Sequence, residues 1–279
     1  MRLTNLEEIA KKIINAGAVS IRDIDNSEEP FVYSTGNRGP GYVMIKGLVG
    51  QPNVLMFLTK NLAHKIIEEK VKFDFIEGNA TGGMIPAWQL SRDLSEILKK
   101  EIPCPYLRES RKEGGHGELI TGDKNNPLIE KGMWALIVEE LVNYAGTVGN
   151  AAEIFRSEGY SVSHAACILS YDHPQSNARL KEKGLNLVSL INLSTIINVA
   201  EANKLFSQKA IDSYKDFLKD PINWQLSRNL VVPTDTAKKA VEKGYSMTKL
   251  STEEAINRGA PAGKVKEGVV YWAQENGKK

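Results

Sequence analysis

The sequence predicts an α/β fold in which a mostly parallel, twisted sheet is flanked by helices. Short apolar runs alternate with longer segments of helical periodicity, and this order implies right-handed crossovers between parallel strands. The run 134–138 is apolar at every position, as expected for a strand that is covered on both faces. Turns rich in small residues at 78–83 and 143–147 both follow predicted strands. We therefore expect both turns at the carboxyl edge of the sheet, where such folds bind ligands.

The N-terminal part predicts a helix and a small hood region of two strands. Apolar residues lie on one face of residues 4–16, and Gly17 is typical of a helix end. Residues 31–33 and 42–45 predict two strands, because glycine and proline between them provide turn chemistry.

The remaining elements follow the hydrophobic pattern and its interruptions. Proline at position 52 favours the start of a helix, and small residues after each apolar run favour the turn into the next one. The predicted strands are 73–76, 105–108, 134–138, 163–169 and 185–191. The predicted helices are 52–69, a helix through Trp88 to Lys100, 147–158, 175–183 and one that starts near Ser194. We expect Trp88, Trp134 and Met84 in the core, because large apolar residues next to strands usually are buried.

The last part of the chain has a different character. Residues 208–279 are polar, contain three prolines, and show helix-like patterns at 209–219, 236–243 and 251–258. We predict a domain at 1–207 that carries the α/β fold and a mainly helical C-terminal extension at 208–279, whose role the pattern does not indicate.

Composition narrows the function class. The chain has 279 residues, 42% of them hydrophobic and 25% charged, with a formal net charge of +2, which argues against a dedicated nucleic-acid binder. No apolar run predicts a membrane span or a signal peptide, and the two cysteines are too few for a disulfide framework. The four histidines show no spacing typical of zinc. We expect a cytoplasmic protein.

The segment from Val138 to Thr147 combines the features of a phosphate site and a sugar site. Glu139 and Glu140 follow the predicted strand, and Ala145-Gly-Thr147 predicts a tight turn into a helix. Backbone N–H groups and the dipole at a helix N-terminus favour an anion. Adjacent carboxylates can accept hydrogen bonds from sugar hydroxyls. Together these features suggest a phosphorylated ribose, but a short motif of this kind, taken alone, is more often an ordinary strand–turn–helix with surface acids.

Three separated stretches together resemble the orotate phosphoribosyltransferases, which have the type I phosphoribosyltransferase fold. Val138-Glu-Glu-Leu-Val-Asn-Tyr-Ala-Gly-Thr147 is similar to the family motif that binds phosphoribosyl pyrophosphate. Phe73-Asp-Phe-Ile-Glu-Gly-Asn-Ala-Thr-Gly-Gly83 is similar to the pyrophosphate-side loop. Residues 106–122 are similar to the mobile catalytic loop. The resemblance covers residues 3–206 in the order of the family.

The resemblance implies transfer of ribose phosphate from phosphoribosyl pyrophosphate to a ring nitrogen of orotate, in pyrimidine nucleotide biosynthesis. It implies Mg²⁺ as the cofactor, without direct protein ligands, and a homodimer whose loop serves the neighbouring site. The residues implied as catalytic are Arg108, Lys112, His116 and Glu140. Those implied to bind substrate are Thr81, Gly82, Gly83, Arg111, Glu139, Asn143, Tyr144, Ala145, Gly146, Thr147 and His173. Neither a nucleic acid nor a membrane is an implied partner.

Several positions depart from the family pattern. Glu140 replaces an aspartate, and Asn143-Tyr-Ala-Gly146 replaces Thr-Thr-Gly-Gly. Ala145 is strained if the turn requires a positive φ there. Glu109 and Ser34 stand where the family has lysines, and His173 stands where an arginine grips the orotate carboxylate.

These departures leave alternatives open. They fit neutral drift after loss of activity, a changed acceptor base, or an enzyme to which the extension or a partner subunit supplies the missing charge. A non-catalytic sensor of phosphoribosyl pyrophosphate or a nucleotide, and a structural subunit without a ligand, are the competing functions. An unrelated nucleotide-binding domain is disfavoured, because the chain lacks a Gly-x-Gly-x-x-Gly turn after an early strand and a P-loop lysine.

Overall fold

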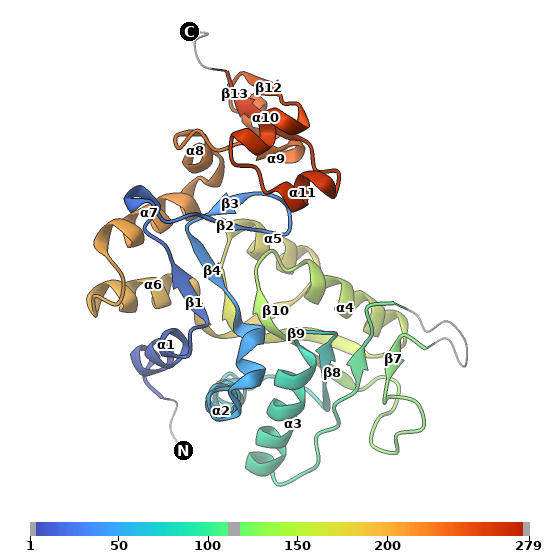
Figure 1. Ribbon diagram of the computed structural model, residues 1–279. Coiled ribbons are helices and arrows are strands. Elements are labelled where there is room, and N and C mark those ends of the chain that lie inside the picture. The colour runs from blue at the N-terminus through green and yellow to red at the C-terminus, as the bar shows by residue number, and fades with distance from the viewer. Residues whose placement is uncertain (1–3, 111–117, 276–279) are drawn as a thin grey trace. The chain divides into compact units, whose positions relative to one another are not determined.

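The computed structural model describes residues 4–110 and 118–275, and the chain divides into two compact units (Figure 1). Unit 1 comprises Met1–Ala18 and Met44–Ala200, and unit 2 comprises Val19–Val43 and Glu201–Lys279. Residues 19–43, which precede the predicted domain boundary at residue 207, thus group with the C-terminal part of the chain.

Unit 1 contains a six-stranded sheet in the order β10-β9-β8-β5-β6-β7, which confirms the predicted α/β class. Neighbouring strands from β10 to β6 run parallel, and β7 pairs antiparallel with β6. The strands are β5 (Phe75–Asn79), β6 (Tyr106–Leu107), β7 (Ile120–Thr121), β8 (Trp134–Val142), β9 (Ser161–Ser170) and β10 (Asn186–Asn192).

Helices cover the two faces of this sheet. Alternate strand residues such as Phe75, Ile137 and Cys167 pack against α4 and α5 in one core, as the period of two in a strand requires. Helices α2 and α3 pack against each other, and α3 lies against β5 and β8. The helices of this unit are α1 (Leu6–Asn15), α2 (Pro52–Glu68), α3 (Met84–Leu98), α4 (Gly146–Ser157) and α5 (Pro174–Glu182). Helix α6 (Leu193–Ala202) begins in unit 1 and ends just beyond Ala200, the last residue of that unit.

Two differences from the predicted elements bear on the site. Strand β8 continues to Val142 instead of ending at residue 138, because its neighbour β9 keeps pairing with it as far as Ser170. Glu139 and Glu140 therefore lie inside the strand. Strand β7 lies in the segment predicted as an open loop and forms a hairpin with β6.

Unit 2 joins residues from both ends of the chain around an aromatic core. Tyr214, Trp224 and Tyr271 are almost fully buried. The backbone N–H of Arg38 donates to the Gln225 side chain at 2.9 Å, across 187 residues of sequence. The 19–43 region and the extension thus share one core.

Unit 2 contains strands close to the two predicted hood strands, but each of them pairs with a strand that was not predicted, and it also contains the mainly helical extension. Its antiparallel pairs are β1 (Val19–Ile21) with β4 (Gly41–Val43) and β2 (Phe31–Val32) with β3 (Arg38–Gly39). Its helices are α7 (Gln208–Lys219), α8 (Pro221–Leu226), α9 (Thr234–Glu242), α10 (Thr252–Asn257) and α11 (Ala262–Lys266). A small sheet of β11 (Val232–Pro233), β13 (Tyr271–Gln274) and β12 (Met247–Lys249), in that order, was not predicted.

Two surface properties complete the description. Across the described ranges 4–110 and 118–275, no helix is both long enough and apolar enough to cross a membrane. Trp88 is 59% exposed, and Ile85 on the same helix is also exposed, so the prediction that Trp88 belongs to the core is wrong. The helix exposes this tryptophan to solvent, whereas Ala87 and Leu90 on the same helix are buried.

Candidate active site at the carboxyl edge of the sheet

Three polar side chains meet where β5 and β8 run side by side. The register pairs Glu77 with Ile137 and Gly78 with Val138, so Asn79 and Glu139 follow at matching positions. Glu77, Asn79 and Glu139 are all buried. Neither carboxyl oxygen of Glu77 forms a hydrogen bond with another described residue, and the nearby Leu107 N–H only partly offsets its burial. Burial therefore raises the pKa of Glu77 well above its ordinary value.

The environment of Glu139 also favours a protonated carboxyl group. Burial comes first, and the neighbouring carboxyl groups of Glu140 and Glu77 add to it. Together they raise the pKa of Glu139 to about 9, although the Asn79 side chain works in the opposite direction. A buried group that keeps its proton at neutral pH can donate a hydrogen bond to a sugar oxygen as well as accept one.

Glu140 lies against the turn that follows β5. A Cβ atom added at Gly82 would collide with the Glu140 carboxyl group, and one added at Gly83 would lie 2.5 Å from the Val138 carbonyl oxygen. The two glycines therefore allow the 78–83 turn to approach β8 closely. Thr81, which follows a cis peptide bond at Ala80, is exposed beside them. The structure thus brings the two motifs predicted from sequence together.

The turn from Asn143 to Thr147 opens α4, as predicted. Ala145 occupies the left-handed region with φ 57° and ψ 21°, so the strain expected for a residue with a Cβ atom is present. Within the described residues, the backbone N–H groups of 144–147 donate no hydrogen bond to a protein acceptor. Gly146 and Thr147 form the first turn of the helix. These unpaired donors at a helix N-terminus suit an anion.

Tyr144 and His173 lie together beside this turn. Their rings stack with centroids 5.1 Å apart and an interplanar angle of 14°. The ring centroid of Tyr171 lies 5.5 Å from that of the same imidazole. Burial lowers the pKa of His173, while Asp172 opposes that shift. A neutral imidazole at position 173 therefore cannot supply the charge of the arginine that the family pattern has there.

The residues expected from the catalytic loop divide into two groups. Arg108 follows β6, its backbone N–H donates to the Leu119 carbonyl at 3.0 Å, and its Nε is buried without a partner in the described part of the chain. Arg111, Lys112 and His116 lie outside the described residues.

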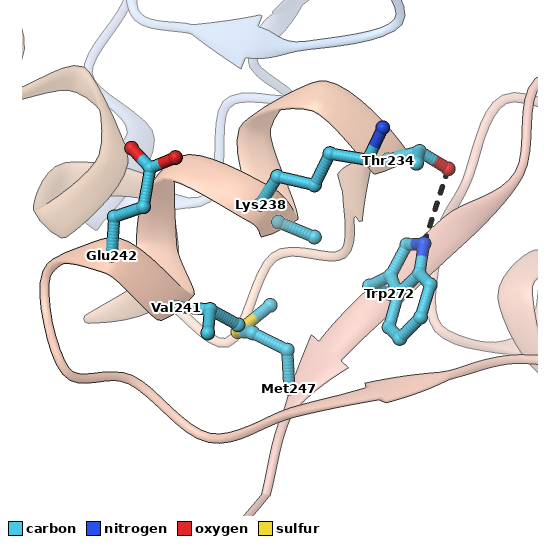
Figure 2. A pocket seen from close by; sticks show the side chains of 7 residues that line it. Thr234, Lys238, Val241, Glu242, Met247 and Trp272 are labelled. Atoms are coloured by element: carbon cyan, nitrogen blue, oxygen red, sulfur yellow. Dashed lines mark hydrogen bonds between the residues drawn. The ribbon is translucent and has the colours of Figure 1, made fainter.

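A separate hollow of about 360 Å³ lies in unit 2 between α9 and the β12–β13 strands (Figure 2). Its lining is mostly apolar, and the Trp272 indole donates to the Thr234 hydroxyl at 3.1 Å. Val241 and Met247 face the same space, whereas Lys238 and Glu242 come from the turns of α9 at its rim. None of the predicted site residues lines this hollow.

The side chains at the sheet edge offer few oxygen ligands for a metal ion. Among the described residues, no group of three or more histidine, cysteine, aspartate or glutamate side chains is arranged to hold a metal ion. Glu140 offers one half-buried carboxyl group beside the 78–83 turn. A Mg²⁺ ion here would need most of its oxygen ligands from phosphates and water, which is its usual mode of binding.

Comparisons with known proteins agree with this geometry. The phosphoribosyl transferase domain family matches residues 51–203. The orotate phosphoribosyltransferase of Enterococcus faecalis is 31% identical over 220 residues, which cover 78% of this chain and 97% of that protein. The chain belongs to the orotate phosphoribosyltransferase family. It is therefore an enzyme of the transferase class, with the type I phosphoribosyltransferase fold.

Further relatives extend the match. The orotate phosphoribosyltransferase of Listeria monocytogenes is 30% identical over 220 residues, covering 78% of this chain and 97% of that protein. The crystal structure of orotate phosphoribosyltransferase from Aeropyrum pernix superposes with a TM-score of 0.54 at 25% identity, covering 71% of this chain and 99% of that chain. The match to the family model ends at residue 203, before the C-terminal extension.

Sequence reasoning missed three residues at this site. Glu77 lies in the middle of β5. In the sequence, its charge indicated only that the predicted strand ends before it. Asn79 was counted as turn chemistry. Arg179 was an ordinary exposed helix residue, and only the fold places its guanidinium beside Tyr144.

Proposed function

We propose that the enzyme transfers ribose phosphate from phosphoribosyl pyrophosphate to orotate, giving the nucleoside 5′-monophosphate and pyrophosphate. One observation carries this proposal: the Glu139–Glu140 pair, the glycine turn at 82–83 and the unpaired N–H groups at 144–147 share one sheet edge. A ribose with a phosphate on one side and a pyrophosphate on the other matches these three groups of donors and acceptors. The curated relatives carry the same activity in their names.

Each group has a role in this chemistry. The N–H groups from 144 to 147 bind the 5′-phosphate, and the dipole of α4 adds to that attraction. Glu139 and Glu140 hold the ribose hydroxyls, and the Glu140 carboxylate stabilises positive charge on the sugar as the bond to pyrophosphate breaks. The backbone of the turn from Thr81 to Gly83 contacts the leaving pyrophosphate.

The cations around the leaving group come from residues after β6. Arg108 has a buried Nε without a hydrogen-bond partner among the described residues, and such a donor is costly to bury unless a ligand uses it. Arg111, Lys112 and His116 are assigned to the same task on the sequence resemblance alone. Mg²⁺, when bound, would neutralise charge on the pyrophosphate, and Glu140 beside Gly82 would be the carboxyl group that faces it.

The acceptor base is proposed to lie near His173. Its neutral imidazole stacks on Tyr144 and presents a planar surface in place of an arginine fork. The predicted alternative, a non-catalytic sensor, gains no support from the relatives, which are named as transferases.

We also propose a cytoplasmic homodimer. Met56 on α2 and Ile85 and Trp88 on α3 are exposed apolar side chains on two helices that pack together, and we call these three residues the α2–α3 patch. We propose this patch as the dimer interface, because exposed apolar surface can mark an interaction site. The extension at 208–279 is proposed as a structural cover for residues 19–43, since Tyr214 packs directly on Gly41.

A panel of acceptors tests the substrate assignment. The purified chain is incubated with phosphoribosyl pyrophosphate, Mg²⁺ and either orotate, uracil or adenine, and the nucleotide product is separated by chromatography. Orotidine 5′-monophosphate from orotate alone is the expected result. Product from another base with none from orotate would reassign the acceptor while keeping the phosphoribosyl transfer.

A further inference from the structure

We propose that Arg179 is a positioning residue for the ribose 5′-phosphate, holding the Asn143–Thr147 turn from α5 and placing a positive charge beside it. This inference rests on the proposed phosphate-binding role of that turn. Arg179 belongs to neither family motif, and its position follows from the contact between α5 and the turn.

The first observation is a hydrogen bond that fixes one peptide plane. Arg179 Nη1 donates to the Tyr144 carbonyl oxygen at 3.1 Å. The peptide bond between Tyr144 and Ala145 is trans. In a planar trans peptide the carbonyl and the following N–H point in opposite directions. Holding the Tyr144 carbonyl towards α5 therefore directs the Ala145 N–H away from Arg179.

The second observation is that two residues of α5 and its N-cap contact Tyr144. His173 at the N-cap of α5 stacks on the tyrosine ring, while Arg179 holds its carbonyl. Ala145, the next residue, has the strained φ of 57°. A left-handed alanine persists only where the surroundings fix it, and these two contacts provide that restraint.

The third observation is the charge that Arg179 brings to a positive helix end. A Cβ atom added at Gly146 would lie 3.3 Å from Arg179 Nη1, so the guanidinium sits against the first residue of α4. Across the residues that the structure describes, Arg179 forms no ion pair. A cation is unfavourable at a helix N-terminus unless an anion also lies there.

The position of Arg179 in α5 does not explain this arrangement by itself. A cation in the last turn of α5 is favourable for that helix, which accounts for the residue type. It does not require the guanidinium to turn towards α4. An anion at the turn satisfies both the unpaired N–H groups and the arginine. Asn143 and Tyr144 stand where the family pattern has Thr-Thr, and Arg179 adds a cationic donor on this side of the turn.

Ligand binding to three variants of the full chain tests this role. Arg179→Gln removes the charge, Arg179→Lys keeps it without the planar fork, and Lys181→Gln is the control for loss of an exposed charge on the same helix. Titration calorimetry with ribose 5-phosphate and, separately, with pyrophosphate gives two dissociation constants for each protein. Thermal melting of each variant confirms that it is folded.

We expect Arg179→Gln to weaken ribose 5-phosphate binding about tenfold, equivalent to about 1.4 kcal/mol, and to leave pyrophosphate binding unchanged. Arg179→Lys should be intermediate and Lys181→Gln should match the wild type. Unchanged ribose 5-phosphate affinity, an equal loss for both ligands, an equal loss in Lys181→Gln, or a wild type that does not bind ribose 5-phosphate would overturn the inference. An Arg179-dependent affinity in a protein that does not turn over orotate would instead reject only the acceptor assignment.

Discussion

The carboxyl group of Glu140 occupies the space that a side chain at Gly82 would need. The two residues come from different motifs, one on β8 and one in the turn after β5, and their contact joins the ribose side of the site to the pyrophosphate side. The family pattern has a shorter aspartate at position 140. The longer glutamate fits here because Gly82 has no side chain to occupy the same space.

This contact predicts that Gly82→Ala displaces Glu140. A shift of about 1 Å in a catalytic group can cost on the order of 100-fold in rate, so we expect a loss of that size in kcat with a folded protein. Gly263→Ala is the matched control, because nothing lies near a Cβ atom there. Steady-state kinetics of both variants decide the point, and wild-type turnover by Gly82→Ala would remove Glu140 from the mechanism.

The buried carboxyl groups predict a loss of stability as pH rises. For Glu77 and Glu139 the folded pKa lies above the ordinary value of 4.5, so the folded state binds more protons than the unfolded state above pH 4.5. Their contribution to stability is complete below that pH and is lost as pH rises through the folded pKa, which for Glu139 is about 9. Each group contributes a slope of up to about 1.4 kcal/mol per pH unit.

Glu77→Gln should therefore flatten the fall in unfolding free energy as pH rises above 4.5, by about one group's slope. Urea unfolding at several pH values measures it. Glu182→Gln, at an exposed position on α5, should keep the wild-type slope. A slope that is the same in Glu77→Gln and wild type would show that Glu77 does not hold its proton in the folded enzyme.

The left-handed Ala145 predicts an unusual response to glycine. Replacing a buried helical alanine such as Ala151 by glycine costs about 1 kcal/mol in helix propensity and about 0.8 kcal/mol in lost burial. At Ala145 the release of about 1 to 2 kcal/mol of backbone strain offsets the lost methyl group. We expect Ala145→Gly to change the free energy of unfolding by less than about 1 kcal/mol and Ala151→Gly to lower it by about 2 kcal/mol. Equal losses in chemical denaturation would contradict a strained turn.

The α2–α3 patch predicts a dimer that depends on Trp88. Trp88→Glu places a charge on this apolar surface and should convert the dimer to a monomer without a change in melting behaviour beyond the loss of association. Val241→Glu, which changes an exposed apolar residue of unit 2, is the control. Sedimentation velocity distinguishes the states. A wild type that sediments as a monomer, or a Trp88→Glu variant that stays dimeric, would place the interface elsewhere or remove it.

The sequence predicted the α/β class because apolar strands in a parallel sheet leave a strong signal, and it predicted the site edge because turns after such strands must lie there. It misplaced the end of β8, since two consecutive glutamates normally stop a buried strand. Burial raises the pKa of Glu139, and Glu140 and Glu77 add to that shift, but only the register of β5 brings Glu77 alongside. Local pattern carries no information of this kind.

The partnership between the two ends of the chain was also beyond local pattern. Arg38 pairs with Gln225, and Gly41 packs on the Tyr214 ring, at separations that no periodicity encodes. The role of Arg179 could not be predicted for a related reason. An exposed arginine on a helix is ordinary in a sequence, and only the fold shows that it donates to the Tyr144 carbonyl. Ala145 was the exception, because a turn motif with a missing glycine pointed to its positive φ before the structure showed it.

Orotate-dependent pyrophosphate release by the full chain, with Mg²⁺ and phosphoribosyl pyrophosphate, tests the central claim most directly. The account predicts release that requires orotate, appears in equal amount with orotidine 5′-monophosphate, and falls strongly in Glu140→Gln. No release from demonstrably folded protein, or release that Glu140→Gln leaves unchanged, would contradict the claim that this sheet edge transfers phosphoribose to orotate.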